Sequence, residues 1–296
     1  MASCNKLNFL LFFLTIFTTT AAGAFYSGVN PFKGLSLFLK GIPFSFTLMA
    51  ILLAHEMGHY IISKRHKIRV TLPYFIPAPP PPIFPFIIGT FGAFIKMQSP
   101  MKDRKSLLDV GVAGPLIGVV ISIPVLIVGL RLSEIRVLPE PKGAMLLGES
   151  ILFSLLAKIT LGDLPEHHHI VLHSVAFAGW IGLLVTSLNL IPIGQLDGGH
   201  ISYALLGEKW YGKVCKFTFA ILLIFGLLGL LGSSGLVRFI GWQGWLMWAA
   251  LLYILGLKHP QPQDFWTPLD RTRKGLGILA MLVFFLTFTP VPIAIS

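Results

Sequence analysis

Charged residues are scarce in this chain of 296 residues: they make up 12% of it, against about 25% in a typical soluble domain. Hydrophobic residues make up 54%, and the mean hydropathy is +0.79. This composition excludes an ordinary soluble globular protein and indicates an integral membrane protein. Cysteine is also nearly absent, and Cys4 and Cys215 alone supply neither a disulfide framework nor a zinc–thiolate site.

Acidic residues are few, with 12 Asp and Glu against 23 Lys and Arg. Such an excess of positive charge can indicate a nucleic-acid-binding protein, but its distribution argues against that class. Most Lys and Arg fall in the segments that share one side of the membrane when the N-terminus is placed in the cytoplasm, as the positive-inside rule expects. The basic charge therefore predicts orientation and contact with the lipid bilayer, and no nucleic-acid partner.

Long apolar runs are abundant and predict an all-α, polytopic helical bundle of six to seven spans. The runs lie near residues 8–25, 43–63, 108–130, 171–193, 214–232, 241–257 and 275–295. The first run can also be interpreted as a signal peptide that ends at Ala22-Gly23-Ala24, although it is long for one. We expect three segments: a span and outer loop over 1–42, a catalytic membrane core over 43–207, and accessory spans over 208–296.

Seven prolines fall between Leu72 and Lys96, in a segment that is otherwise largely apolar. Proline at this density excludes a regular helix, and irregular backbone at membrane depth requires a protein or water-filled environment. The segment is therefore predicted to be re-entrant or to form a short β-hairpin, with Gly89, Thr90, Phe91 and Gly92 as a candidate strand edge. A packed proline loop at the membrane interface is an equally good interpretation.

Residues 55–59 read HEMGH and follow an apolar run. Ionisable residues at membrane depth are costly, which makes them candidates for function. On a helix His55 and His59 share one face and can bind one metal ion, while Glu56 lies beside them as a candidate general base.

A second polar cluster, NLIPIGQLDGGH over residues 189–200, ends the fourth predicted span at the same membrane face. Asp197 is the best third ligand of a zinc site with one Zn²⁺ per chain. Pro192, Gly194, Gly198 and Gly199 are expected to break the fourth helix so that Asp197 can turn toward the metal. Asp109 is a rival, but no glycine or proline break beside it would turn it toward the metal. Asn189 is a candidate donor to the substrate, and His200 is interpreted as a supporting histidine. His167-His168-His169 falls in the acidic outer loop, where a solvated turn is expected.

These motifs resemble the site-2 proteases, the intramembrane zinc metalloproteases, in HEMGH and in Asn189-x-x-Pro192-x-x-x-x-Asp197-Gly198. The stretches LPYFIPAP (72–79), GTFGAFI (89–95), AGPLIG (113–118) and 176–200 resemble a compact bacterial and plastid-type branch without PDZ or CBS domains. The resemblance implies His55, His59 and Asp197 as zinc ligands, Glu56 as catalytic base and Asn189 near the substrate. It also implies that Gly89–Gly92 belongs to a strand edge that pairs with an unwound transmembrane substrate.

The predicted function is hydrolysis of transmembrane segments of other proteins near the cytoplasmic face, in a bacterial inner membrane or a plastid-like membrane. Two alternatives remain open from the residues alone. A metal transporter or another metal-binding membrane protein without protease activity would use the ligands but would have no use for Glu56 as a base. A structural zinc site would require four protein ligands, and the sequence offers only three good ones.

Overall fold

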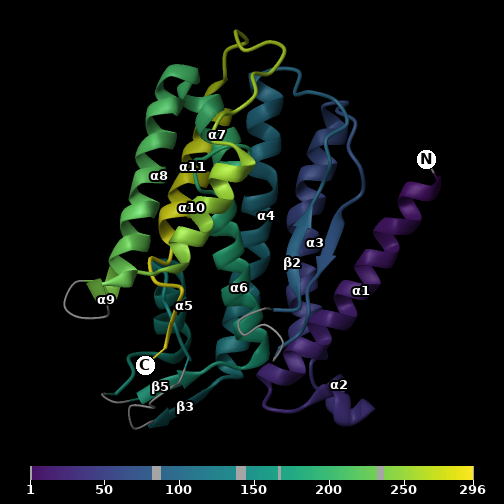
Figure 1. Ribbon diagram of the computed structural model, residues 1–296, viewed down its shortest axis with the longest axis vertical. Coiled ribbons are helices and arrows are strands. Elements are labelled where there is room, and N and C mark those ends of the chain that lie inside the picture. The colour runs from purple at the N-terminus through teal and green to yellow at the C-terminus, as the bar shows by residue number, and fades with distance from the viewer. Residues whose placement is uncertain (1, 82–87, 138–144, 166–167, 232–236, 296) are drawn as a thin grey trace. The chain divides into compact units, whose positions relative to one another are not determined.

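A computed structural model describes residues 2–81, 88–137, 145–165, 168–231 and 237–295 of the chain, which is mostly helical (Figure 1). The helices are α1 (Ala2–Tyr26), α2 (Leu35–Leu39), α3 (Ile42–Arg65), α4 (Arg104–Arg131), α5 (Ile151–Leu161), α6 (Ser174–Asn189), α7 (Asp197–Leu206), α8 (Glu208–Leu230), α9 (Val237–Ile240), α10 (Gly244–Leu255) and α11 (Arg271–Thr287), with a 3₁₀ turn at Pro31–Lys33. The strands are β1 (Tyr74–Pro77), β2 (Thr90–Phe94), β3 (Glu134–Val137), β4 (Met145–Leu147), β5 (His168–Val171) and β6 (Ile293–Ile295).

Four helices of the described chain are long and apolar enough to cross a membrane: α1 from Lys6, α3, α4 and α8. Three further apolar helices, α5, α6 and α10, have 11, 16 and 12 residues. Sixteen residues of α-helix rise about 24 Å, short of the ~30 Å of a bilayer core. The helical class is therefore confirmed, and the count of six to seven spans stays a prediction.

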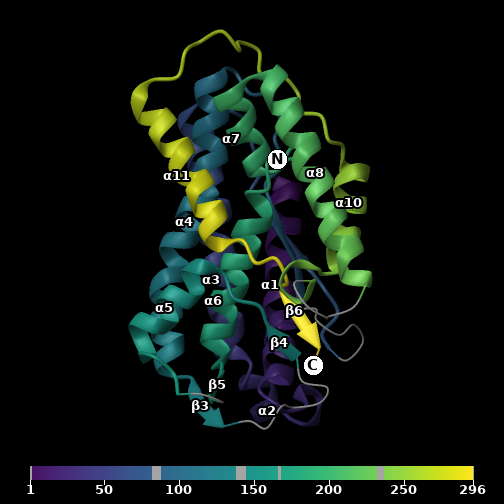
Figure 2. The same ribbon diagram turned by 90° about the vertical axis from the view of Figure 1, so that its left-hand side faces the viewer.

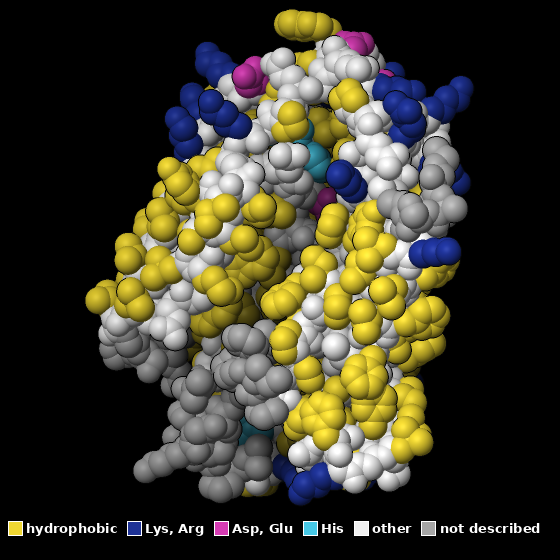
Figure 3. Space-filling model, turned by 45° about the vertical axis from the view of Figure 1, so that its right-hand side comes forward, with side chains coloured by type: hydrophobic (Ala, Val, Ile, Leu, Met, Phe, Trp, Pro, Cys, Tyr) yellow, Lys and Arg dark blue, Asp and Glu magenta, His cyan; other side chains and the backbone are white. Residues whose placement is uncertain are grey.

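The long helices carry large apolar side chains on their outer surfaces. Phe13 of α1, Phe217 of α8 and Phe285 of α11 each expose more than 60% of their surface. Figure 3 shows hydrophobic side chains over much of the face that it draws. Exposed apolar area of this extent suits contact with lipid rather than with water.

The chain divides into two compact units, and α4, α5 and α6 each run from one unit into the other. The first unit comprises residues 1–100, 117–136 and 156–183. In it α1 packs against α3 and β1 (Figure 1). Two buried side chains hold α1 in place: Asn8 donates to the carbonyl oxygens of Leu72 (2.8 Å) and Pro73 (3.0 Å), and the hydroxyls of Thr19 and Ser45 lie 2.6 Å apart.

The proline-rich segment contains a short antiparallel β-pair, which confirms the hairpin prediction in part. Tyr74 of β1 is opposite Phe94 of β2, and the register shifts before Pro77 pairs with Thr90. The interval 82–87 lies outside the described residues, and the re-entrant course of the segment stays a prediction. None of the seven prolines falls within β2, so β2 keeps its backbone donors.

The second unit comprises residues 101–116, 137–155 and 184–296. Figure 2 shows its helices α7, α8, α10 and α11, in which α7 packs on α8 and α11, and α8 packs on α10. Strands β4 and β6 pair antiparallel, with Met145 opposite Ile295. The predicted division of the chain at residues 42 and 207 stays a prediction.

Candidate metal centre

Two histidines on one face of α3 form the first half of the site. His55 and His59 are separated by one helical turn, and both are buried, with 4% and 6% of their surface exposed. Their Nε2 atoms lie 3.2 Å apart. Two nitrogens bound to one tetrahedral zinc at 2.0–2.1 Å would be separated by about 3.3 Å, so the pair matches one edge of such a site. Glu56, also buried, lies beside them in the sequence.

The second half of the site is a helix that starts at Asp197. Helix α6 ends at Asn189, and α7 begins at Asp197 after a turn in which Gly194 has a φ of +59°. That backbone conformation strongly favours glycine. The expected break in the fourth span is therefore confirmed, although Gly198 and Gly199 lie inside α7 rather than in the break.

The two glycines are needed because the first turn of α7 packs closely against the preceding turn. A Cβ on Gly198 would lie 1.9 Å from the carbonyl oxygen of Leu190, and one on Gly199 would lie 2.3 Å from that of Gly194. The glycines therefore permit close approach of two backbone segments, and this close approach determines where Asp197 starts its helix.

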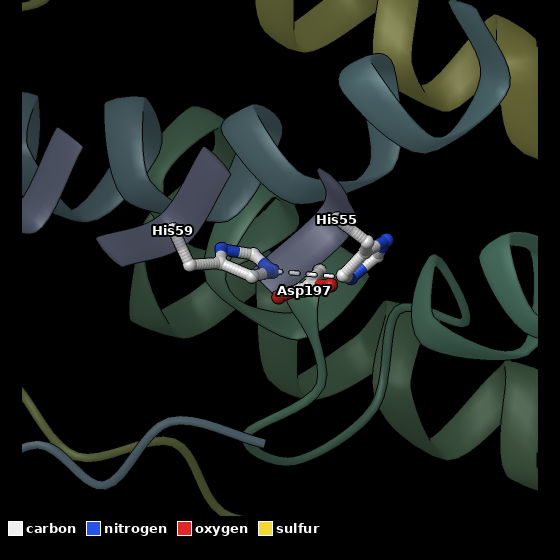
Figure 4. A group of neighbouring side chains, drawn as sticks. All are labelled: His55, His59 and Asp197. Atoms are coloured by element: carbon white, nitrogen blue, oxygen red, sulfur yellow. Dashed lines mark hydrogen bonds between the residues drawn. The ribbon is translucent and has the colours of Figure 1, made fainter. Parts of the chain in front are cut away.

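The structure brings the three predicted ligands together. One ligand atom from each of His55, His59 and Asp197 lies within 4.8 Å of the others. Figure 4 shows the two imidazoles facing each other with the carboxylate of Asp197 beside them. Two imidazoles and one carboxylate fit a single divalent metal ion and leave a coordination position for a small ligand, an arrangement that is typical of catalytic rather than structural sites.

Comparison with known proteins places this geometry in a family. The model of peptidase family M50 matches residues 43–233, which contain all three candidate ligands and Glu56. The chain belongs to peptidase family M50. This confirms the resemblance to the site-2 proteases that the motifs indicated, and with four candidate spans it indicates a multi-pass membrane protein.

Among curated proteins, this M50 chain is 33% identical over 244 residues to the probable zinc metalloprotease EGY1, chloroplastic, of Oryza sativa subsp. japonica. The aligned region covers 73% of the chain and 39% of the relative. It is 29% identical over 271 residues to the probable zinc metalloprotease EGY2, chloroplastic, of Arabidopsis thaliana, covering 90% of the chain and 45% of the relative. The chain thus spans less than half the length of these relatives.

The rival carboxylate of this M50 protein, Asp109, has a different neighbour. It lies on α4 and accepts hydrogen bonds from Arg273 of α11, whose Nε is 2.9 Å from Oδ1 and whose Nη2 is 2.7 Å from Oδ2. The interaction is bidentate and half-buried. Asp109 is therefore engaged in an ion pair with Arg273, and it is not among the three residues whose ligand atoms cluster.

The candidate substrate residues of the M50 chain lie on two elements. Asn189 is the last residue of α6 and is half-buried. Gly89 precedes β2, while Thr90, Phe91 and Gly92 belong to it. The Thr90 hydroxyl donates to the carbonyl of Ile76 across the β-pair, and Phe91 exposes 63% of its surface. Because the sheet has two strands, one edge of β2 is not paired with β1. Contact of these residues with substrate stays a prediction.

The remaining histidines of interest are not among the three clustered ligands. His168 and His169 belong to β5, and His167 lies outside the described residues. His200 of α7 is buried, and its Nδ1 lies 2.6 Å from Nε2 of His259. His259 could not be predicted from the sequence, because a single histidine after an apolar run has no spacing that marks it.

Proposed function

We propose that this M50 protein is an intramembrane zinc endopeptidase that hydrolyses transmembrane segments of other proteins. The observation that carries the proposal is the convergence of ligand atoms from His55, His59 and Asp197 within 4.8 Å, with Glu56 next to His55 in the chain. A transporter or another metal-binding protein would use the same ligands but would leave a buried glutamate beside them without a role.

Zinc is the metal that the donor set and the relatives' names support. Two imidazoles and one carboxylate are a common ligand set of catalytic zinc sites. The charges of one Zn²⁺, Asp197 and Glu56 sum to zero, which reduces the cost of burying them together. When bound, zinc would polarise a peptide carbonyl and make a water molecule more acidic.

Glu56 and Asn189 supply the remaining chemistry. Glu56 accepts a proton from the attacking water while the water oxygen bonds to the peptide carbon. Glu56 then passes that proton to the departing amine as the C–N bond breaks. The Asn189 amide donates a hydrogen bond to the substrate carbonyl, where negative charge develops in the transition state. Asp197 and the two histidines hold the metal ion.

The substrate is a transmembrane helix that unwinds locally, because a helix hides its peptide bonds in its own hydrogen-bond ladder. The freed backbone would pair with β2 at Thr90–Gly92, along the edge that does not pair with β1, since strand addition satisfies backbone groups that lipid cannot satisfy. Phe91 is exposed on that strand and is available for side-chain contact.

The charge distribution supports an orientation with the N-terminus in the cytoplasm and the metal centre near the cytoplasmic face. A bacterial inner membrane and a plastid-like membrane both fit, and the names of the curated relatives support the plastid type.

The test compares the wild type with Glu56→Gln, both purified in detergent and incubated with a panel of single-span substrates. Zinc per chain and cleavage are measured on the same samples. We expect both proteins to retain about one zinc, and only the wild type to cleave, with a loss of at least ~100-fold in the variant. Glu149→Gln, which changes an exposed glutamate, is the matched control and should behave like the wild type.

Three outcomes would contradict the proposal. Equal cleavage by Glu56→Gln would exclude Glu56 as the base. A wild type that binds zinc but cleaves no member of the panel would favour a metal-binding protein without protease activity. A wild type that binds no zinc would contradict the assignment of His55, His59 and Asp197 as metal ligands.

A further inference from the structure

A pair of histidines lies in the second compact unit, with the buried His200 on the helix that presents Asp197 and the half-buried His259 on another segment. His200 is in the first turn of α7, three residues after Asp197. Its Nδ1 lies 2.6 Å from Nε2 of His259, which belongs to the segment between α10 and α11. The proposed reaction uses neither imidazole, and His259 lies beyond residues 43–233, the part that the family model matches.

Hydrogen bonds determine which nitrogen of each ring carries a proton. Nδ1 of His259 lies 2.6 Å from the carbonyl oxygen of Pro260, and because a carbonyl only accepts, this Nδ1 is the donor. Burial lowers the pKa of His259 to about 4, so the ring is neutral at pH 7 and its Nε2 carries a lone pair. Nδ1 of His200 therefore donates to it, and a neutral His200 has its own lone pair on Nε2.

The segment around His259 also contacts the turn before Asp197. The Tyr211 hydroxyl lies 3.2 Å from the carbonyl oxygen of Gly194 and 3.3 Å from that of Leu257. A Cβ on Gly194 would lie 2.5 Å from the carbonyl oxygen of Gly256. Residues 256–260 thus contact both the turn that precedes Asp197 and the helix that follows it.

The other end of α7 is held by a second group from the same unit. Arg104 donates to the carbonyl oxygens of Ala204 and Leu205, which the end of the helix leaves without intrahelical partners. The Arg104 guanidinium lies over the ring of Phe265, 4.9 Å from its centroid. Since a helix of ten residues is unstable alone, these contacts add to the packing of α7 on α8 and α11 in fixing its position.

We propose that His259 is a positioning residue of the metal centre: by accepting a hydrogen bond from His200, it fixes the first turn of α7 and so orients the carboxylate of Asp197. This inference rests on the proposed zinc site. Mutation of residues that hold metal ligands in place without touching the metal typically lowers the metal affinity by about 10- to 100-fold. We expect an effect of this size from loss of the acceptor.

The test uses full-length protein in detergent and two substitutions of His259. His259→Phe keeps a flat ring that can stack on Tyr203, whose ring centroid is 4.5 Å from that of His259, but it removes the acceptor. His259→Gln keeps an acceptor in place of Nε2. Trp245→Phe is the control for a general loss of stability, because it removes the hydrogen bond from the buried indole to Pro290 without touching α7.

Zn²⁺ affinity is measured by competition with a chromophoric chelator, and Co²⁺ is used as a spectroscopic probe of ligand geometry. We expect His259→Phe to weaken Zn²⁺ binding at least ~10-fold and to change the visible Co²⁺ spectrum, while His259→Gln stays within a few-fold of the wild type. Trp245→Phe should lower the thermal midpoint and leave both metal readouts unchanged.

Unchanged Zn²⁺ affinity in His259→Phe would overturn the inference, as would an equal loss in the Phe and Gln variants or a loss matched by Trp245→Phe. If His259→Phe does not fold, His259→Asn takes its place, because the shorter amide can bond Pro260 but cannot reach His200. A wild type without Zn²⁺ affinity would instead refute the proposed function, so the two failures are distinguishable.

Discussion

Substitution of Gly198 by alanine tests how closely the position of Asp197 depends on backbone packing. The added Cβ would lie 1.9 Å from the Leu190 carbonyl oxygen and 2.3 Å from its carbon, whereas ordinary contacts begin at 3.4 Å. The obstacle is backbone rather than a flexible side chain, so α7 must move away from Leu190 by about 1.5 Å, the difference between 1.9 and 3.4 Å. Asp197 is the adjacent residue and moves with the helix.

A displacement of this size is large for a metal ligand, whose bond lengths vary by only about 0.2 Å. A misplacement of about 1 Å in a catalytic site can cost roughly 100-fold in rate. We therefore expect Gly198→Ala to lose at least ~10-fold in Zn²⁺ affinity and ~100-fold in cleavage. Overpacking of the same contact should also lower stability by about 1–3 kcal/mol.

The assay measures Zn²⁺ affinity by chelator competition, thermal midpoint by intrinsic fluorescence, and cleavage of a single-span substrate. Gly212→Ala in α8 and Gly275→Ala in α11 are matched controls, because a Cβ at either position meets nothing within 4 Å. Alanine in an open helix interior stabilises by about 0.5–1 kcal/mol, so both controls should be at least as stable as the wild type. The reasoning is refuted if Gly198→Ala binds zinc and cleaves like Gly212→Ala.

Two further predictions concern the rest of the chain. Ala22 and Ala24 are fully buried, and Asn8 donates hydrogen bonds to the backbone before β1, so removal of residues 1–24 should lower the thermal midpoint. Intact-mass spectrometry of the mature protein should show that these residues are retained. A truncated protein that is stable and fully active would contradict this prediction. Asp109→Asn and Arg273→Gln should each destabilise by about 1–3 kcal/mol, since each removes the bidentate ion pair between the two residues, although Arg273 keeps its ion pair with Asp270 in the first variant. The double variant should cost less than the sum of the two, and additive losses would exclude coupling.

The local half of the metal centre could be predicted from the sequence because its geometry follows from helix periodicity. His55 and His59 are separated by one turn, and that spacing alone places their nitrogens on one face. Pro192 and Gly194 likewise predicted that the helix ends before Asp197, as it does at Asn189. The prediction that Gly198 and Gly199 would help to break the helix was wrong, because close packing against Leu190 and Gly194, rather than a turn, requires them.

Hydrophobic runs predicted where helices form but not how long they are. The run at 171–193 continues through Leu190, Ile191 and Ile193, yet α6 ends at Asn189 and has 16 residues. Those apolar residues are buried in the turn between α6 and α7 instead. Apolar residues occur both where a segment is buried in lipid and where it is buried in protein. Apolar composition therefore cannot distinguish a membrane span from a packed turn.

The carboxylate half depends on contacts that no local pattern encodes. His259 is 59 positions from His200, and Arg104 is about 100 positions from the α7 carbonyls that it caps. Together with the packing of α7 on α8 and α11, these contacts hold a ten-residue helix that is unstable alone. A motif such as Asp-Gly-Gly-His can identify a ligand, but the position of that ligand is a property of the fold. We therefore propose that the segment at 256–260, remote from the motif in the sequence, helps to position the carboxylate ligand.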